Sequence, residues 1–247
     1  AEASGGLGDL DDALGNVNLG LVAAAGNGVR LRAVFQALSV TGIAVGLFKA
    51  AQAASDLGES TSKATVVFGE GIDEVQAFAD TSATAIGLSE SAALEATGTF
   101  GNLFVALGAT KDTATDLAPE VVGLAADLAS FNNLGVEETL EKLRSGLVGE
   151  IEPLRSLGIS FGAAEVEAKA MELGLADANG TISEGAKLQA RWALILEQST
   201  TAQGDFARTS GGLANQQRIL TAEFQNAVTA LGQALLPALL EGVAVAR

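Results

Sequence analysis

Apolar side chains recur every three or four residues along the C-terminal part of the chain, which is the spacing of one face of an α-helix. The stripe follows a break at 210–212 and consists of Leu220, Phe224, Val228, Leu231, Leu235 and Leu239. This pattern predicts a long amphipathic helix over residues 213–240. A single apolar stripe is buried when it faces another helix, so we expect it to pack against a helix of another copy of the chain.

Shorter segments with the same spacing precede this helix and predict several short to medium helices, separated by Gly or Pro. Ser89 and Thr110 stand before two of them as N-caps, and Thr181 with Glu184 forms a capping box at the start of another. Pro119 predicts either a kink or the true start of its helix. The predicted helices cover residues 71–85, 89–107, 110–131, 137–148, 163–174, 181–207 and 213–240.

The N-terminal part of the chain is less regular. Residues 1–30 are rich in Gly, Asp and Asn and predict a loosely ordered arm or a poorly defined helix. The apolar residues 33–57 predict one helix, and the run 66–69 predicts an extended turn. The sequence as a whole therefore predicts a mostly α protein.

Within the first apolar segment, residues 33–48 carry no charge and include Gly42 and Gly46, a spacing that lets helices approach closely. A helix that spans a bilayer needs about 20 apolar residues, which is longer than this stretch. We expect a helix buried within the module or between copies, and we keep membrane contact as the alternative.

Composition adds a constraint on partners. The 247 residues carry a formal net charge of −16, and 48% of them are hydrophobic but only 4% aromatic. Binding of nucleic acid through a general basic surface is excluded, because attraction to phosphates needs clustered Lys and Arg. A mean hydropathy of +0.34 is high for a soluble monomer and favours an oligomeric helical assembly.

The residues that the chain lacks exclude several kinds of chemistry. It contains no Cys and no His, which excludes disulfides, thiolate or imidazole metal sites, and Ser-His or Cys-His nucleophiles. The segment 158–162 matches the G-x-S-x-G motif around Ser160, but that motif works with a His, so we expect Ser160 to cap the next helix. Residues 60–63 match S-x-x-K without its companion motifs.

Two further patterns suggest sites that the spacing does not support. Asp177 to Ser183 looks like the middle of a calcium loop, but the positions that should carry the outer carboxylates are Leu175 and Ala186. Glu150 and Glu152 are a close carboxylate pair beside Pro153, which we interpret as a turn. We therefore predict no catalytic, cofactor-binding or metal-binding residue, no cofactor, and no enzyme activity.

Six longer strings carry a resemblance to a known family. They are VVFGEG at 66–71, FADTSATAIGLSESAALEATGTFGNLF at 78–104, LAADLASFNN at 124–133, LRSGLVGEIEPLRSLGI at 143–159, ARWALILEQSTTAQGDFARTSGGLANQQRIL at 190–220 and ALGQALLPAL at 230–239. In this order they resemble the core region of phage tail tape measure proteins of the long non-contractile type.

The resemblance implies a structural virion protein that templates assembly of the tail tube, sets its length, lies in the tail lumen or at the tail tip, and assists DNA ejection. It implies synthesis in the bacterial cytoplasm and assembly as a few parallel copies, often three. It also implies contacts with tail tube and tail tip proteins, and with the host membrane during ejection. We divide the chain into an arm and apolar helix (1–54), a core-like module (55–240) and a tail that continues into a longer parent chain (241–247). The alternative is a membrane-active helical protein that acts through residues 33–54.

Overall fold

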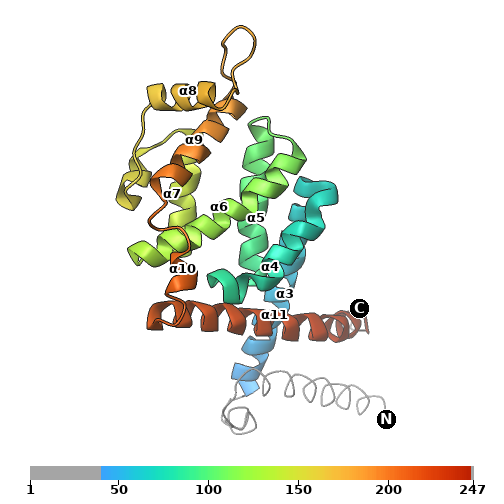
Figure 1. The fold of residues 1–247 in the computed structure, drawn as a ribbon. Helices are drawn as coiled ribbons and strands as arrows, with labels where there is room; N and C mark the ends of the chain where they lie inside the picture. Colours follow the sequence, from blue (N-terminus) through green and yellow to red (C-terminus); the bar gives the residue numbers. More distant parts are fainter. Residues whose placement is uncertain (1–39, 246–247) are drawn as a thin grey trace, which may run out of the picture. The chain divides into compact units, whose positions relative to one another are not determined.

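The computed structural model describes residues 40–245, and within them the side chains of residues 46–237. The described part contains nine α-helices, two 3-10 helices and no strand, which confirms a mostly α fold (Figure 1). The elements are α3 Val40–Phe68, η1 Gly69–Gly71, α4 Ile72–Ile86, α5 Glu90–Ala106, α6 Lys111–Asn132, α7 Val136–Val148, η2 Glu152–Leu157, α8 Ala163–Glu172, α9 Glu184–Gln198, α10 Asp205–Arg208 and α11 Leu213–Val245.

The chain forms two compact units. The larger unit is Ser60–Glu223, and the smaller one combines Ala1–Glu59 with Phe224–Arg247. Helices α3 and α11 each run through both units without interruption. The predicted arm at 1–30 and the start of the helix predicted over 33–57 lie outside the described residues.

The core of the larger unit is built around α6, which packs on α4, α5, α7 and α10. Its buried side chains are small, including Ala114, Ala118, Val121, Val122, Ala125, Ala126 and Ala129. Small side chains let helix axes approach closely, and larger residues fill the remaining space from neighbouring helices. Phe68 is one of these, because it occupies the position where a Cβ on Gly101 would stand.

Local signals fix the starts of several helices as predicted. Ser89 caps α5, with its Oγ accepting from the Ala92 N–H at 3.4 Å, and Thr110 caps α6, with its Oγ1 accepting from the Thr113 N–H at 3.1 Å. Pro119 lies inside α6, so it does not start that helix. Asn133 ends α6 in the left-handed conformation with φ of 53°.

The prediction of an extended turn at 66–69 is wrong. Val66, Val67 and Phe68 are the last residues of α3, and the chain turns only afterwards, in the 3-10 helix η1. The apolar run is helical because Phe68 and Ala64, four residues apart, are buried on one face of α3. The helix predicted to end at residue 57 therefore continues through Gly58 to Phe68.

Three predictions about helix starts and ends are also wrong. Ser183, not Thr181, caps α9, because the Thr181 N–H is held by the Asp177 carboxylate in the preceding turn. The helix ends at Gln198 instead of Ala207, since Gly204 adopts φ of 74° and separates α9 from the short α10. Further upstream, the helix α8 begins after Gly162, whose N–H donates to Glu165 at 2.6 Å, so Ser160 is not its cap.

In the smaller unit, α3 and α11 make a close contact at a glycine that the sequence analysis did not select. A Cβ on Gly232 would collide with the carbonyl oxygen of Ala50 and lie 3.0 Å from the Cβ of Ala54. At Gly46, no atom of the described residues lies within 4 Å of the same position, so the described part of this chain makes no close approach there, and packing between copies stays a prediction. The surroundings of Gly42 lie outside the described residues.

Candidate assembly site

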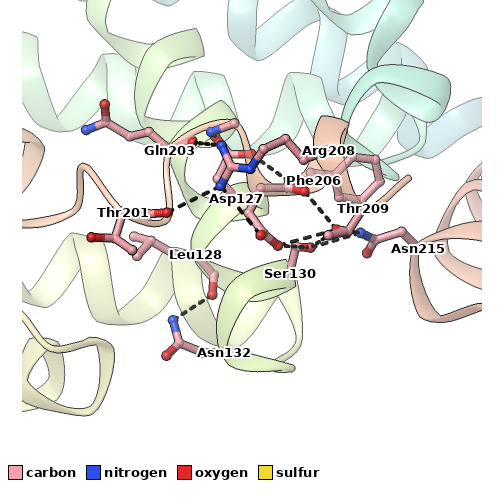
Figure 2. Close-up of polar contacts among 12 residues, drawn as sticks. Asp127, Leu128, Ser130, Asn132, Thr201, Gln203, Phe206, Arg208, Thr209 and Asn215 are labelled. Carbon is pink, nitrogen blue, oxygen red and sulfur yellow. Dashed lines mark hydrogen bonds and ion pairs between the residues drawn. The ribbon is translucent and has the colours of Figure 1, made fainter. Parts of the chain in front are cut away.

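A cluster of polar side chains holds the end of α6 and the start of α11 together in the larger unit. We call it the α6–α11 clamp, and it consists of Asp127, Ser130, Asp205, Thr209, Asn215 and Arg218. Figure 2 shows most of these side chains converging from α6, α10 and the first turn of α11. Buried polar groups must find partners to offset the loss of hydration, and in the clamp they find one another.

Asp127 forms the first part of the clamp. Its carboxylate accepts from the backbone N–H groups of Gly204, at 2.6 Å, and Phe206, at 3.0 Å. These donors lie at the N-terminus of α10, where backbone N–H groups have no partner within the helix. A carboxylate is suited to that position because its charge also faces the positive end of the helix dipole.

Ser130 and Asn215 form the second part. Ser130 Oγ donates to Asp205 Oδ2 at 2.7 Å and accepts from Asn215 Nδ2 at 2.8 Å. The same Asn215 amide donates to Thr209 Oγ1 at 2.9 Å. Asn215 is 3% exposed, so this amide is buried and fully engaged.

Arg218 completes the clamp from the next turn of α11. Its guanidinium donates to Asn215 Oδ1 at 2.6 Å and to the Leu134 carbonyl oxygen at 2.8 Å. Leu134 lies two residues after the end of α6, so the second bond holds the turn that follows that helix. The first turns of α11 are therefore fixed to the body of the larger unit through one polar face.

The other face of these turns carries apolar side chains that none of the described residues covers. Leu213 is 86% exposed, Leu220 67% and Phe224 66%, and we call these three residues the exposed α11 face. A helix turns by about 100° per residue, so they lie opposite the side on which Asn215 and Ala222 are buried. Contiguous exposed apolar side chains on a helix are typical of an interaction surface.

The predicted apolar stripe is thus divided between two environments. Leu220 and Phe224 are exposed, Val228 and Leu231 are half-buried, and Leu235 is 4% exposed. Leu239 lies outside the described side chains. The C-terminal half of the stripe packs within the chain and the N-terminal half is open.

The serine motifs are not assembled into catalytic groups. Ser160 is exposed, and its backbone N–H donates to Gln198 Oε1 at 2.8 Å. In the S-x-x-K motif, the Lys63 ammonium donates to Thr99 Oγ1 at 2.9 Å, on another helix. No bond joins Lys63 to Ser60, so neither serine has a base beside it.

The carboxylates singled out in the sequence have structural partners. Asp177 Oδ1 accepts from the N–H groups of Asn179 and Thr181 at 2.9 and 2.7 Å, which organises a turn. Glu152 pairs with Arg155 at 3.0 Å on the surface. Among residues 40–245 no group of three or more Asp and Glu side chains is placed to hold a metal ion.

A shallow pocket of about 160 Å³ lies between α7, α8 and α9. It is lined by Gly149, Ile151, Gly162, Ala163, Val166, Glu167, Lys187 and Arg191. Both cations already have partners, because Lys187 pairs with Glu184 at 2.7 Å and Arg191 donates to the Leu147 carbonyl oxygen at 3.1 Å. The lining contains no Ser, Thr or Cys.

Lys169 fastens α8 to α9. Its ammonium bonds to Glu172 and to Glu197, each at 2.7 Å, and its side chain is 10% exposed. The hydrogen bond to Glu172, followed by the one to Glu197, raises the pKa of Lys169 above its usual value. The ion pair with Glu197 therefore joins α8 to α9.

Comparisons with protein families, curated proteins and solved structures find no match for this chain. Among the described helices, none has the length and apolar character needed to cross a bilayer.

Proposed function

We propose that this chain is a structural module of a phage tail tape measure protein, which templates tail tube assembly and length, occupies the tail lumen or tip, and assists DNA ejection. The observation that carries the proposal is the ordered set of strings from 66–71 to 230–239. The mostly α fold is compatible with it. In this proposal the chain is not an enzyme and holds no cofactor.

Within such a protein, this module organises assembly. The segment whose length sets the length of the tail, which we call the ruler, lies elsewhere in a longer chain. A ruler gains length at about 1.5 Å per residue when it is one continuous helix. Here the described helices are mostly short, and α4, α5, α7 and α10 pack on α6, so we expect that added residues would not add length in proportion. A compact module of this kind is suited to docking on tube or tip proteins.

The proposed partners include other copies of the chain, three in the simplest arrangement, joined through residues 213–240. Support comes from the exposed α11 face, which leaves Leu220 and Phe224 open on a helix that the clamp fixes in place. Burying each large apolar side chain stabilises an interface by about 1.5–3 kcal/mol. The proposal includes no specific contact with nucleic acid.

Self-association is tested by sedimentation of the purified chain at several concentrations. Leu220→Asp should lower the mass of the assembly, whereas Thr221→Asp, the adjacent exposed position on another side of the helix, should not. Both variants should keep the far-UV circular dichroism of the parent chain. Equal masses for the two variants would show that the exposed α11 face is not the interface.

The function itself is tested in particles of the source phage. Peptides of this chain should be found in purified tails, and in-frame deletion of residues 110–135 should abolish or scramble tail assembly. A sharp population of tails shorter by about 40 Å, which is the helical length of the deleted segment, would identify this segment as part of the ruler. Absence of the chain from purified particles would overturn the proposal.

The absence of catalysis has its own test. Ser160→Ala and Ser62→Ala should leave particle assembly and infectivity unchanged, because the proposal gives neither hydroxyl a catalytic role. Loss of a hydrolytic activity in either variant would contradict a purely structural role.

The second candidate is a membrane-active protein that acts through residues 33–54. One observation favours it, which is the 71% exposure of Phe48 on α3. The chain should then release dye from liposomes, and Phe48→Ser should reduce the release. Chain that neither binds nor permeabilises liposomes would remove this candidate and leave the tail proposal intact.

A further inference from the structure

The loop between α8 and α9 carries a dipeptide with its own chemistry. Asn179 and Gly180 are both exposed, and Gly180 adopts φ of 79°, a conformation that glycine reaches without strain. Among the described residues, no atom outside the chain neighbours lies within 4 Å of the position that a Cβ on Gly180 would occupy. An asparagine followed by glycine is therefore presented to solvent with no side chain crowding the backbone nitrogen between them.

We propose that Asn179 is a site of spontaneous deamidation in the folded protein. The backbone nitrogen of Gly180 loses its proton to water or hydroxide and attacks the side-chain carbonyl carbon of Asn179. Ammonia leaves as the new carbon–nitrogen bond closes a succinimide ring. Water then opens the ring at either carbonyl and gives aspartate or isoaspartate, without an oxidant or a reductant.

Asp177 is a positioning residue that slows this reaction. Its backbone carbonyl oxygen accepts from the Gly180 N–H at 2.9 Å, which holds the attacking nitrogen in the turn. Its carboxylate accepts from the N–H groups of Asn179 and Thr181 and keeps the turn closed. The Gly180 nitrogen must leave its hydrogen bond before it can reach the side chain of Asn179.

The product changes the loop and not the core. Either product adds a negative charge two residues from Asp177, and isoaspartate also lengthens the backbone by one methylene group. Asn179 makes no side-chain bond to the helical body in the described structure. We expect the modified chain to keep its helix content and to differ in charge at this loop.

The experiment follows the Asn179 peptide by mass spectrometry in native protein incubated at mildly alkaline pH. Asn102, which is exposed on α5 and precedes Leu103, is the comparison site, and Asn27-Gly28 is the reference pair in chain denatured with urea. In native protein, Asn179 should convert faster than Asn102. In urea, the rates at Asn179 and Asn27 should be similar. Asn179→Gln should remove the signal.

Two variants test the role of Asp177. Asp177→Ala should accelerate conversion at Asn179 by about tenfold in native protein, because about tenfold is the effect of losing hydrogen bonds of ordinary strength. The rate at Asn27 should stay unchanged. Asp177→Asn keeps an acceptor oxygen without the charge and should restore the slow rate. Conversion at Asn179 no faster than at Asn102 would overturn the site, and no acceleration in Asp177→Ala would overturn the role of Asp177.

Discussion

Removing the Asp127 carboxylate should destabilise the larger unit more than any other single polar change on α6. The carboxylate makes two hydrogen bonds, to the Gly204 and Phe206 N–H groups, and both are partly buried. Bonds to a charged group contribute about 1.5–3 kcal/mol each, and a donor left without a partner adds a desolvation penalty. Because the loop can relax toward water, we expect Asp127→Ala to lower the free energy of unfolding by about 3 kcal/mol.

Asp116→Ala is the matched control, since Asp116 is an exposed aspartate on the same helix. Both changes replace Asp by a better helix former, which stabilises a helix by about 0.5 kcal/mol and cancels in the comparison. Trp192 is the single tryptophan of the chain and is buried on α9, so its fluorescence in urea reports on the larger unit. If Asp127→Ala and Asp116→Ala unfold at the same urea concentration, the clamp does not stabilise the unit.

Three further predictions concern packing and charge. Leu235→Asp places a charge at a buried position and should lower the free energy of unfolding by about 3 kcal/mol or more. Leu220→Asp, at an exposed position, should change it by about 0.5 kcal/mol or less, as urea titration will measure. Gly101→Val should lower the melting temperature, because the new side chain meets the ring of Phe68; an unchanged melting temperature would mean that Phe68 can move aside. The pKa of Lys169 is higher in the folded chain than its ordinary value of 10.5. Its ion pairs therefore stabilise the fold fully below pH 10.5, and this stabilisation is lost as the pH rises through the folded pKa. Lys169→Met should therefore flatten the loss of stability above pH 10.5, and an identical alkaline profile in the variant would contradict this assignment.

The sequence by itself determined those features of the fold that depend on neighbouring residues. Apolar spacing predicted the mostly α fold, because the period of an amphipathic helix is visible within a few turns. Ser89 and Thr110 were identified as N-caps, since a cap acts on backbone N–H groups two or three residues away. The start of the last helix near Leu213 was also correct, because the glycines before it interrupt the helical pattern.

Where two residues could each begin or end a helix, only the tertiary structure decided which of them does so. Thr181 and Ser183 are both acceptable caps by residue type, and the choice depends on the Asp177 carboxylate, which already holds the Thr181 N–H. The end of α9 was likewise not predicted, because Ala202 and Phe206 continue a helical spacing, whereas in the structure Gly204 adopts φ of 74° and its N–H donates to Asp127.

The sequence analysis did not predict the α6–α11 clamp, because its contacts join segments that are far apart in the sequence. Asp127, Ser130 and Asn215 look like ordinary surface residues in a helical pattern. The hydrogen bonds that hold them join positions 75 to 85 residues apart. Their partners exist only after α6, α10 and α11 have packed. The sequence predicted an apolar stripe on the last helix, but the clamp decides which part of that helix is held against the body, and so leaves Leu220 and Phe224 exposed.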